Sequence, residues 1–233
     1  MTQPIKQSLK QTQDMLAKHH RNGEVFAEMM KESFASRFNE KFWGMWQEHI
    51  EPSLPEQATI VDLGTGPGSF LKAIIERYPQ ARAIGVECAP YMLEAVVDLP
   101  DNAQIMMADL HDPHLALEDN SVDVAVASVV VHEMSQPIKS FFEVQRILKP
   151  GGLFYILDWV RVPLEQYLES HDVPIFERAT GADALDDLFT HFIEHNRFSV
   201  DDLVFMLSHC GFEISFKEML NNNQLTRLIA RKR

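Results

Sequence analysis

A glycine-rich segment, Val61-Asp62-Leu63-Gly64-Thr65-Gly66-Pro67-Gly68, is the part of this 233-residue sequence best suited to hold a ligand. It follows an apolar run, Thr59 to Leu63, and precedes apolar residues at helical spacing. Glycines between a strand and a helix let the backbone turn tightly and approach a ligand closely. Taken alone, the segment is equally compatible with an ordinary glycine-rich turn.

Two acidic residues follow the next two predicted strands. Glu87 ends the apolar run that begins at Arg82, and Asp109 follows the run from Ala103 to Ala108. In an open α/β sheet these strand ends lie at one edge, beside the glycine-rich turn. A carboxylate at Glu87 can accept hydrogen bonds from both hydroxyls of a ribose, and Asp109 can meet the amine of an adenine. The three features together predict a site for an adenosine-containing ligand.

Strand-like and helix-like runs alternate from Thr59 onward, and the strand-like runs are almost continuously apolar. This pattern is typical of an α/β fold with a doubly wound, Rossmann-like sheet that helices cover on both faces. Three asparagines separate the last two apolar runs, so the mostly parallel sheet is expected to close with an antiparallel C-terminal strand. The predicted strands are 59–63, 82–87, 103–108, 122–130, 153–159, 212–220 and 225–230.

The first fifty residues are expected to be helical and to form a separate N-terminal cap, residues 1–52. Within them Phe34, Phe38, Phe42 and Trp46 recur every four residues, which predicts one face of a single helix. This face either packs in the core or belongs to a lid over a pocket. Residues 53–233 are expected to form the ligand-binding core, with an insertion at about 160–198 that contains a helix over 183–196.

The composition narrows the function classes. The net charge of −13 disfavours nucleic-acid binding, because an acidic surface repels phosphate backbones. Cys88 and Cys210 are far apart and form no C-x-x-C pair, which fits a reducing compartment. The N-terminus has no apolar run typical of a signal peptide, and no stretch has the roughly 20 apolar residues of a membrane span. A cytoplasmic protein that does not act on membranes is therefore expected.

The glycine-rich segment resembles motif I of class I S-adenosylmethionine-dependent methyltransferases. Glu87 falls where that family has its ribose-binding acid, and Asp109-Leu110 falls at its adenine-contacting position. The run from Val122 to Ser128 is similar to the family's fourth strand, and Lys149-Pro150-Gly151-Gly152 is similar to the turn before its fifth. The resemblance spans about residues 58–229 and fades over the N-terminal helices and the insertion.

The resemblance implies an enzyme that transfers a methyl group from S-adenosylmethionine to an acceptor and releases S-adenosylhomocysteine. It implies that Gly64 and Gly66 pass under the methionine and ribose, that Asp62 faces the amino group, and that Ser128 flanks the methionine end. Met92 is expected to pack on the adenine ring. The cofactor-binding residues expected from it are Asp62, Gly64, Thr65, Gly66, Gly68, Glu87, Cys88, Met92, Asp109, Leu110 and Ser128.

Two other functions stay open. A nicotinamide-dependent oxidoreductase is disfavoured because its G-x-G-x-x-G fingerprint is replaced here by G-x-G-x-G from Gly64. In addition, the negative charge of Asp62 suits a sulfonium amino acid better than a pyrophosphate. A non-catalytic protein that binds the same cofactor, as a sensor or partner subunit, is not distinguished by the sequence.

The acceptor side of the site is predicted to lie just beyond the fourth strand, near Ser128. The segment there has no Asn/Asp-Pro-Pro-Tyr motif typical of amino-nitrogen methyltransferases, which together with the acidic charge favours a small-molecule acceptor. His132 is the one histidine of this segment, and its ordinary pKa suits proton transfer near neutrality. His132 is therefore either a general base or a residue that hydrogen-bonds the backbone at the strand end.

No metal site is expected from the sequence. His111-Asp112-Pro113-His114 and His132-Glu133 contain residues of ligand type, but neither has H-E-x-x-H or paired-cysteine spacing. His19-His20 and the pair His191 and His195 are each compatible with a ligand pair on one helix, but solvated surface histidines are the expected interpretation.

Overall fold

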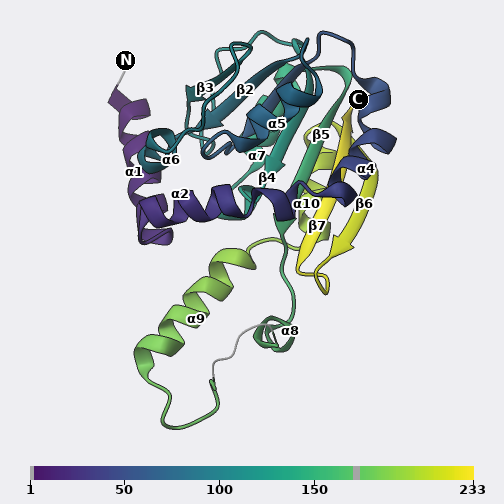
Figure 1. The fold of residues 1–233 in the computed structure, drawn as a ribbon. Coiled ribbons are helices and arrows are strands. Elements are labelled where there is room, and N and C mark those ends of the chain that lie inside the picture. The colour runs from purple at the N-terminus through teal and green to yellow at the C-terminus, as the bar shows by residue number, and fades with distance from the viewer. Residues whose placement is uncertain (1–2, 170–173) are drawn as a thin grey trace.

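The computed structural model describes residues 3–169 and 174–233 and shows a seven-stranded sheet with helices on both faces (Figure 1). The strands lie in the order β3-β2-β1-β4-β5-β7-β6. They are β1 (Thr59–Leu63), β2 (Arg82–Glu87), β3 (Ala103–Met107), β4 (Val122–Ser128), β5 (Leu148–Trp159), β6 (Phe212–Leu220) and β7 (Leu225–Lys232).

The first five strands run parallel, and β7 pairs antiparallel with both β5 and β6. The β6–β7 hairpin turns through Asn221, Asn222 and Asn223, which all adopt positive φ. Asparagine tolerates this left-handed conformation better than most residues do, so three of them in a row specify the turn. The predicted fold class, a Rossmann-like, mostly parallel sheet with an antiparallel C-terminal strand, is confirmed.

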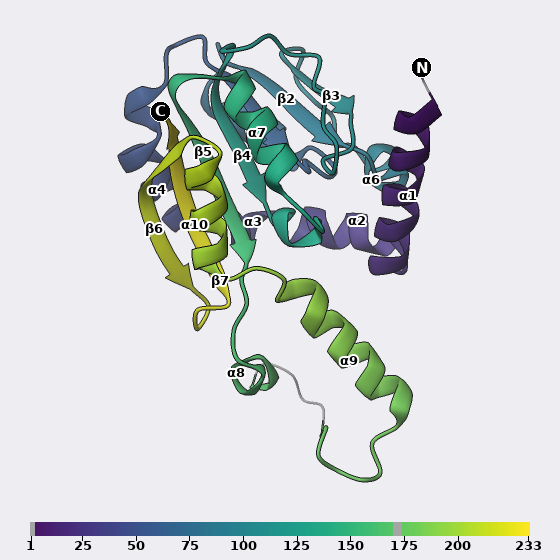
Figure 2. The ribbon, with the colours of Figure 1, turned by 180° about the vertical axis from the view of Figure 1, so that it is seen from behind.

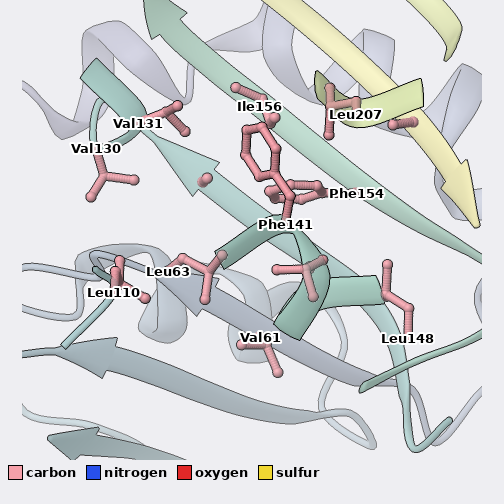
Figure 3. Close-up of a cluster of buried hydrophobic side chains, with 14 of the residues drawn as sticks. Val61, Leu63, Leu110, Val130, Val131, Phe141, Leu148, Phe154, Ile156 and Leu207 are labelled. Atoms are coloured by element: carbon pink, nitrogen blue, oxygen red, sulfur yellow. The ribbon is translucent and has the colours of Figure 1, made fainter. Parts of the chain in front are cut away.

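Alternate residues of the central strands point to two separate hydrophobic layers. Val124 and Val126 of β4 face the layer beneath α4 (Glu40–His49) and α5 (Ser69–Arg77). Ala125 and Ala127 face the opposite layer, where α7 (Ile138–Ile147) and α10 (Val200–His209) pack, as the rear view shows (Figure 2). Figure 3 shows this second layer, in which Phe141 of α7 meets Phe154 of β5. Burial on both faces explains the continuous apolar character of β4.

The N-terminal region divides into several helices. They are α1 (Gln3–His19), α2 (Gly23–Glu32), α3 (Phe34–Arg37) and α4. The prediction of one helix face from Phe34 to Trp46 is wrong, because the helix is interrupted at Phe38 and restarts where the Asn39 side chain accepts the N–H groups of Lys41 and Phe42.

Core packing nevertheless explains the aromatic residues. Phe42 and Trp46 are completely buried, and Phe38 and Phe42 lie with ring centroids 4.8 Å apart. Thus α4 belongs to the sheet core, whereas α1 and α2 form a separate cluster with α6 (Pro90–Glu94). Figure 1 shows α2 running across the arrowhead ends of the strands.

The insertion after β5 holds α8 (Leu164–Leu168) and α9 (Ala182–His195), while its residues 170–173 lie outside the described residues. The predicted helix over 183–196 is thereby confirmed. Ser199 caps α10 by accepting the N–H of Asp202, whose carboxylate accepts the N–H of Ser199. Two short 3-10 helices, η1 (Glu51–Ser53) and η2 (Val131–Glu133), complete the described elements. Among all the described helices, none has the length and apolar content that crossing a membrane requires.

Replacing Phe42 with alanine tests the assignment of α4 to the core. We expect the free energy of unfolding to fall by about 3–5 kcal/mol, because a buried phenylalanine leaves a cavity that its neighbours fill only in part. Urea unfolding measures the change. Val25→Ala in α2 is the control, since Val25 is 64% exposed and its loss should change the stability by less than about 0.5 kcal/mol. Equal, small effects of both substitutions would contradict the assignment.

Candidate functional site

The turn between β1 and α5 has three glycines at positive φ, 64° at Gly64, 57° at Gly66 and 80° at Gly68. A Cβ at Gly64 would lie 2.4 Å from the Val130 side chain, so glycine is required for packing there. At Gly66 the nearest atom to a Cβ would be the sulfur of Met92, 3.7 Å away. Gly66 therefore leaves open space above the turn, whereas Gly68 packs the start of α5 against Leu99.

Glu87, at the end of β2, holds this turn from below. Its Oε2 accepts the N–H of Gly66 at 2.9 Å, and its Oε1 accepts the N–H groups of Cys88 and Ala89 at 2.7 and 2.8 Å. Burial raises the pKa of the Glu87 carboxyl, and the three N–H donors oppose that rise. The carboxylate is thus fixed in position beside the space left open by Gly66.

This space belongs to a cavity of about 620 Å³, open mouth included, which we name the glutamate cavity. One side of the cavity is formed by the carboxyl ends of the parallel strands, and the opposite side is formed by α1 and α2. A cleft at this edge of an open α/β sheet is where such folds bind ligands. The lining residues are Thr12, Leu16, His20, Phe26, Met30, Gly64, Gly66, Val86, Glu87, Cys88, Ala89, Met92, Ala108, Leu110, His111, Val129, Val130, Glu133 and Met134.

Polar contacts attach α1 to the strand ends. Thr12 Oγ1 donates to Asp109 at 2.9 Å, and Gln13 Nε2 donates to the Cys88 carbonyl at 2.8 Å. Burial works to raise the pKa of Asp109, but hydrogen bonds from His111 and Thr12 outweigh it and lower the pKa to about 2. Asp109 is therefore ionised and holds α1 in place, rather than forming part of the cavity wall.

A second cavity, the arginine cavity, adjoins the first at Gly64 and Met30. Arg37 of α3 reaches into it, with one guanidinium nitrogen 3.4 Å from Ser128 Oγ and another donating to the Met30 carbonyl at 3.2 Å. Its buried Nε has no hydrogen-bond partner among the described residues.

Burial raises the pKa of the neighbouring Asp62 to about 7, and the positive charge of Arg37 opposes this rise. The cavity thus offers a cation and an acid side by side. It is lined by Met30, Phe34, Arg37, Phe38, Asp62, Gly64, Thr65, Pro67, Ser69, Phe70 and Ser128.

Asp158, at the end of β5, organises the turn that follows β4. Its Oδ2 accepts the N–H groups of Val130 and Val131 at 3.0 and 2.6 Å, and its Oδ1 lies 2.7 Å from Nδ1 of His132. The turn contains Val129 at φ 59°, a conformation that is strained for a β-branched residue. Neither Asp158 nor Arg37 was predicted as a functional residue. The signal for Asp158 was an acid at the end of an apolar strand next to β4.

His132 faces a third cavity, the histidine cavity, of about 570 Å³ with its open mouth included. Glu133 lines both this cavity and the glutamate cavity, so the two adjoin. Burial works to lower the pKa of His132, but the Asp158 carboxylate outweighs it and raises the pKa. The histidine cavity is lined by Met15, Leu16, Lys18, His19, His132, Glu133, Thr190, Glu194 and Arg197.

The interpretation of His19, His20 and His195 as solvated surface histidines is wrong. The side chains of His19 and His20 are only 14% and 5% exposed, and His195 is half-buried against the rings of His132 and His191. Helical spacing in the sequence did not reveal this burial, since the covering groups come from other segments.

The structure brings most of the predicted cofactor residues together. Gly64, Gly66, Glu87, Cys88, Met92 and Leu110 line the glutamate cavity, and Asp62, Gly64, Thr65 and Ser128 line the arginine cavity. Gly68 and Asp109 support the walls from behind.

Comparison with known proteins finds a family match over part of the chain. Residues 61–156, from β1 into β5, match the family described as a methyltransferase domain. The region from β1 into β5, with the glycine turn after β1, is thus similar to a methyltransferase domain. The glycine turn and Glu87 both lie within the matched residues.

Curated relatives of the chain share about a hundred residues with it. Trans-aconitate 2-methyltransferase of Azoarcus sp. (strain BH72) is 35% identical over 103 residues, 44% of this chain and 40% of the relative. Demethylmenaquinone methyltransferase of Chlamydia trachomatis is 30% identical over 116 residues, 50% of this chain and 51% of the relative. The matched part thus spans about half, or less, of the length of these relatives.

Solved structures of low sequence identity share the fold. An S-adenosylmethionine-dependent methyltransferase from Mesorhizobium loti superposes with a TM-score of 0.58 at 21% identity, covering 81% of this chain and 97% of the other. The [4+2]-cyclase SpnF superposes with a TM-score of 0.57 at 18% identity, covering 76% and 74%. Since one of these two proteins is named for a cyclisation, the shared fold alone does not specify methyl transfer.

The pKa of Asp62 predicts a pH-dependent stability for this protein. Its ordinary value is 3.8 and its value in the fold is about 7. Between these values the unfolded chain has released the proton and the folded chain retains it, so the stability falls as the pH rises from about 4 to about 7. Asp62→Asn should make this fall smaller in urea unfolding at pH 5 and pH 8. Asp101→Asn, at an exposed loop position, should not alter it. The same pH dependence in Asp62→Asn and the parent would contradict the burial of an ionisable Asp62.

Proposed function

We propose that this protein transfers the methyl group of S-adenosylmethionine to a small-molecule acceptor. The proposal rests on the open turn at Gly66 and the fixed carboxylate of Glu87, which meet in one cavity of the methyltransferase domain. The relatives that are named for trans-aconitate and demethylmenaquinone support a small-molecule acceptor. The net charge of −13 argues against a nucleic-acid acceptor.

The two cofactor cavities fit the two ends of S-adenosylmethionine. We infer that the adenosine part occupies the glutamate cavity, where Glu87 accepts hydrogen bonds from the ribose hydroxyls and Met92 packs on the adenine. The amino-acid part then reaches the arginine cavity past Gly64. There the unpartnered Nε of Arg37 can donate to the carboxylate, and Asp62 can pair with the ammonium group.

Bound S-adenosylmethionine supplies a methyl group activated by a sulfonium, so the chain itself has to bind, orient and exclude water. We assign water exclusion to α1 and α2, which cover the glutamate cavity. The α4 part of the predicted cap has no such role, since it packs in the core. We place the acceptor in the histidine cavity, from which it reaches the methyl group past Glu133. Orientation of this kind can lower a barrier by several kcal/mol.

Cofactor binding is the direct test of the proposal. Titration calorimetry should show binding of S-adenosylmethionine and S-adenosylhomocysteine, with little binding of NAD. Glu87→Ala should weaken binding by about 1.5–3 kcal/mol, the usual contribution of hydrogen bonds to a charged group. Glu143→Ala is the matched control, because Glu143 is equally buried and accepts a backbone N–H far from the cavity.

Unchanged affinity in Glu87→Ala would show that Glu87 does not bind the ribose. Tight binding of NAD without binding of S-adenosylmethionine or S-adenosylhomocysteine would overturn the proposal. Turnover is then followed as formation of S-adenosylhomocysteine over a panel of metabolites. Cofactor binding without turnover of any of them would assign the chain to the non-catalytic binding proteins instead.

His132 is proposed to act on the acceptor. Its imidazole is held by Asp158 in the cavity assigned to the acceptor, which suits the predicted base. His132→Gln should therefore lower the turnover rate on the order of a hundredfold or more and leave cofactor affinity intact. His209→Gln, on the exposed side of α10, is the control. A rate within a few fold of the parent at saturating acceptor would leave His132 with only its hydrogen-bonding role.

A further inference from the structure

Three histidines from three distant segments converge beside the histidine cavity. His19 ends α1, His132 lies in η2, and His195 ends α9. One ring nitrogen of each lies within 4.8 Å of those of the other two. The ring centroids of His132 and His195 are 4.8 Å apart and those of His19 and His195 are 5.6 Å apart. Figures 1 and 2 both show α9 beneath the end of α1, on the side of the strand ends.

Nδ1 of each of the three rings lies close to an oxygen atom. Nδ1 of His132 lies 2.7 Å from Asp158, and Nδ1 of His19 lies 2.7 Å from Glu194. Nδ1 of His195 lies 3.0 Å from the backbone carbonyl of His191. Such contacts favour the tautomer with the proton on Nδ1, so that Nε2 presents its lone pair. Histidines that bind metals are oriented in the same way, by a carboxylate or carbonyl on the other nitrogen.

We propose that His19, His132 and His195 bind a divalent transition-metal ion of the zinc class through their Nε2 atoms. Three imidazoles are the protein ligands of one type of catalytic zinc site, in which a fourth position stays open. Imidazole also suits zinc better than it suits calcium or magnesium, which prefer oxygen ligands. The open position would face the histidine cavity, which His19 and His132 line.

The distances are compatible with this assignment. Zinc lies about 2.0–2.1 Å from each nitrogen, which places tetrahedral ligands about 3.4 Å apart. The three nitrogens therefore have to approach one another by up to about 1.4 Å from their 4.8 Å limit. Rotation of side chains at the ends of α1 and α9 can supply this movement.

The neighbouring group of His19, His20 and Glu133 is a weaker candidate. His20 has both nitrogens engaged, Nδ1 with the Tyr91 hydroxyl and Nε2 with Glu133 at 2.9 Å. Glu133 adds negative charge next to the three-histidine site but is not one of the proposed ligands. Because Glu133 also lines the glutamate cavity, an acceptor oxygen bound at the open metal position would lie toward the methyl group. This use of the ion, unlike its binding, rests on the proposed methyl transfer.

Metal binding by the full chain tests the proposal without cofactor or acceptor. Protein stripped with a chelator is titrated with zinc and with cobalt(II), by calorimetry and by the visible spectrum of cobalt. We expect one ion per chain, a spectrum typical of low coordination number, and a higher melting temperature with metal. His19→Ala and His195→Ala should each weaken binding at least a hundredfold. Glu194→Gln, which alters only the orienting contact to His19, should weaken it about 10- to 100-fold.

His209→Ala is the matched control, since His209 also ends a helix with Nδ1 2.9 Å from the carbonyl four residues earlier. It should bind metal like the parent. Binding of S-adenosylhomocysteine verifies that each variant is folded. If the parent does not bind this ligand either, circular dichroism is used to verify folding instead. No binding of either ion by the parent, or equal binding by the parent and both alanine variants, would overturn the proposal.

Nε2 of a metal-bound His132 has no lone pair left to accept a proton, so the ligand role would replace the base role proposed above, and the same samples separate the two. A metal ligand requires that His132→Gln lose the bound ion together with its activity. Loss of activity with one zinc per chain retained would refute the ligand role of His132. Failure of the chain to bind S-adenosylmethionine would leave the metal titration unaffected, so the two proposals fail separately.

Discussion

The carboxylate of Asp158 fixes the part of the structure on which all three cavities depend. It is fully buried, and a buried carboxylate is tolerated only where donors surround it. Here the donors are the N–H groups of Val130, Val131 and Trp159 and the ring of His132. These bonds hold the chain after β4 in one course despite the left-handed Val129. That course places Val130 against Gly64, Glu133 between the glutamate and histidine cavities, and His132 in the wall of the histidine cavity.

The sheet and the cofactor half of the site were predictable because their signals are local. Strand period, the glycines of the turn and the acid at the end of β2 all lie within short stretches of sequence. The register that brings Glu87 beside Gly66 follows from parallel pairing of β1 and β2, which the alternation of strands and helices implied. The glycine spacing was informative for a physical reason, since Gly64 and Gly66 both adopt positive φ and Gly64 lies too close to Val130 for a side chain.

The rest of the site depends on contacts between distant segments, for which the sequence carries no comparable signal. Arg37 could be recognised only once α3 was placed over the turn, and the histidine cluster only once α1 and α9 met. For Asp109 the sequence predicted the position but not the contacts of its side chain. Its position at the end of β3 was predicted, but its engagement by Thr12 and His111 depends on where α1 docks. The interruption at Phe38 was missed because apolar periodicity continues through it, whereas the cap at Asn39 decides where α4 begins.

The contacts between α1 and α9 have a consequence for how ligands come and go. Besides the ring contacts, the helices are linked by His19 with Glu194 and by Arg21 with Asp187, an exposed pair. Exposed ion pairs contribute little to stability and are screened by salt. Separating α9 from α1 therefore breaks no sheet hydrogen bond and disturbs neither main hydrophobic layer. In the metal-free chain the proposed acceptor cavity at this contact can therefore open while the sheet stays rigid, whereas an ion held by His19 and His195 would keep the two helices together.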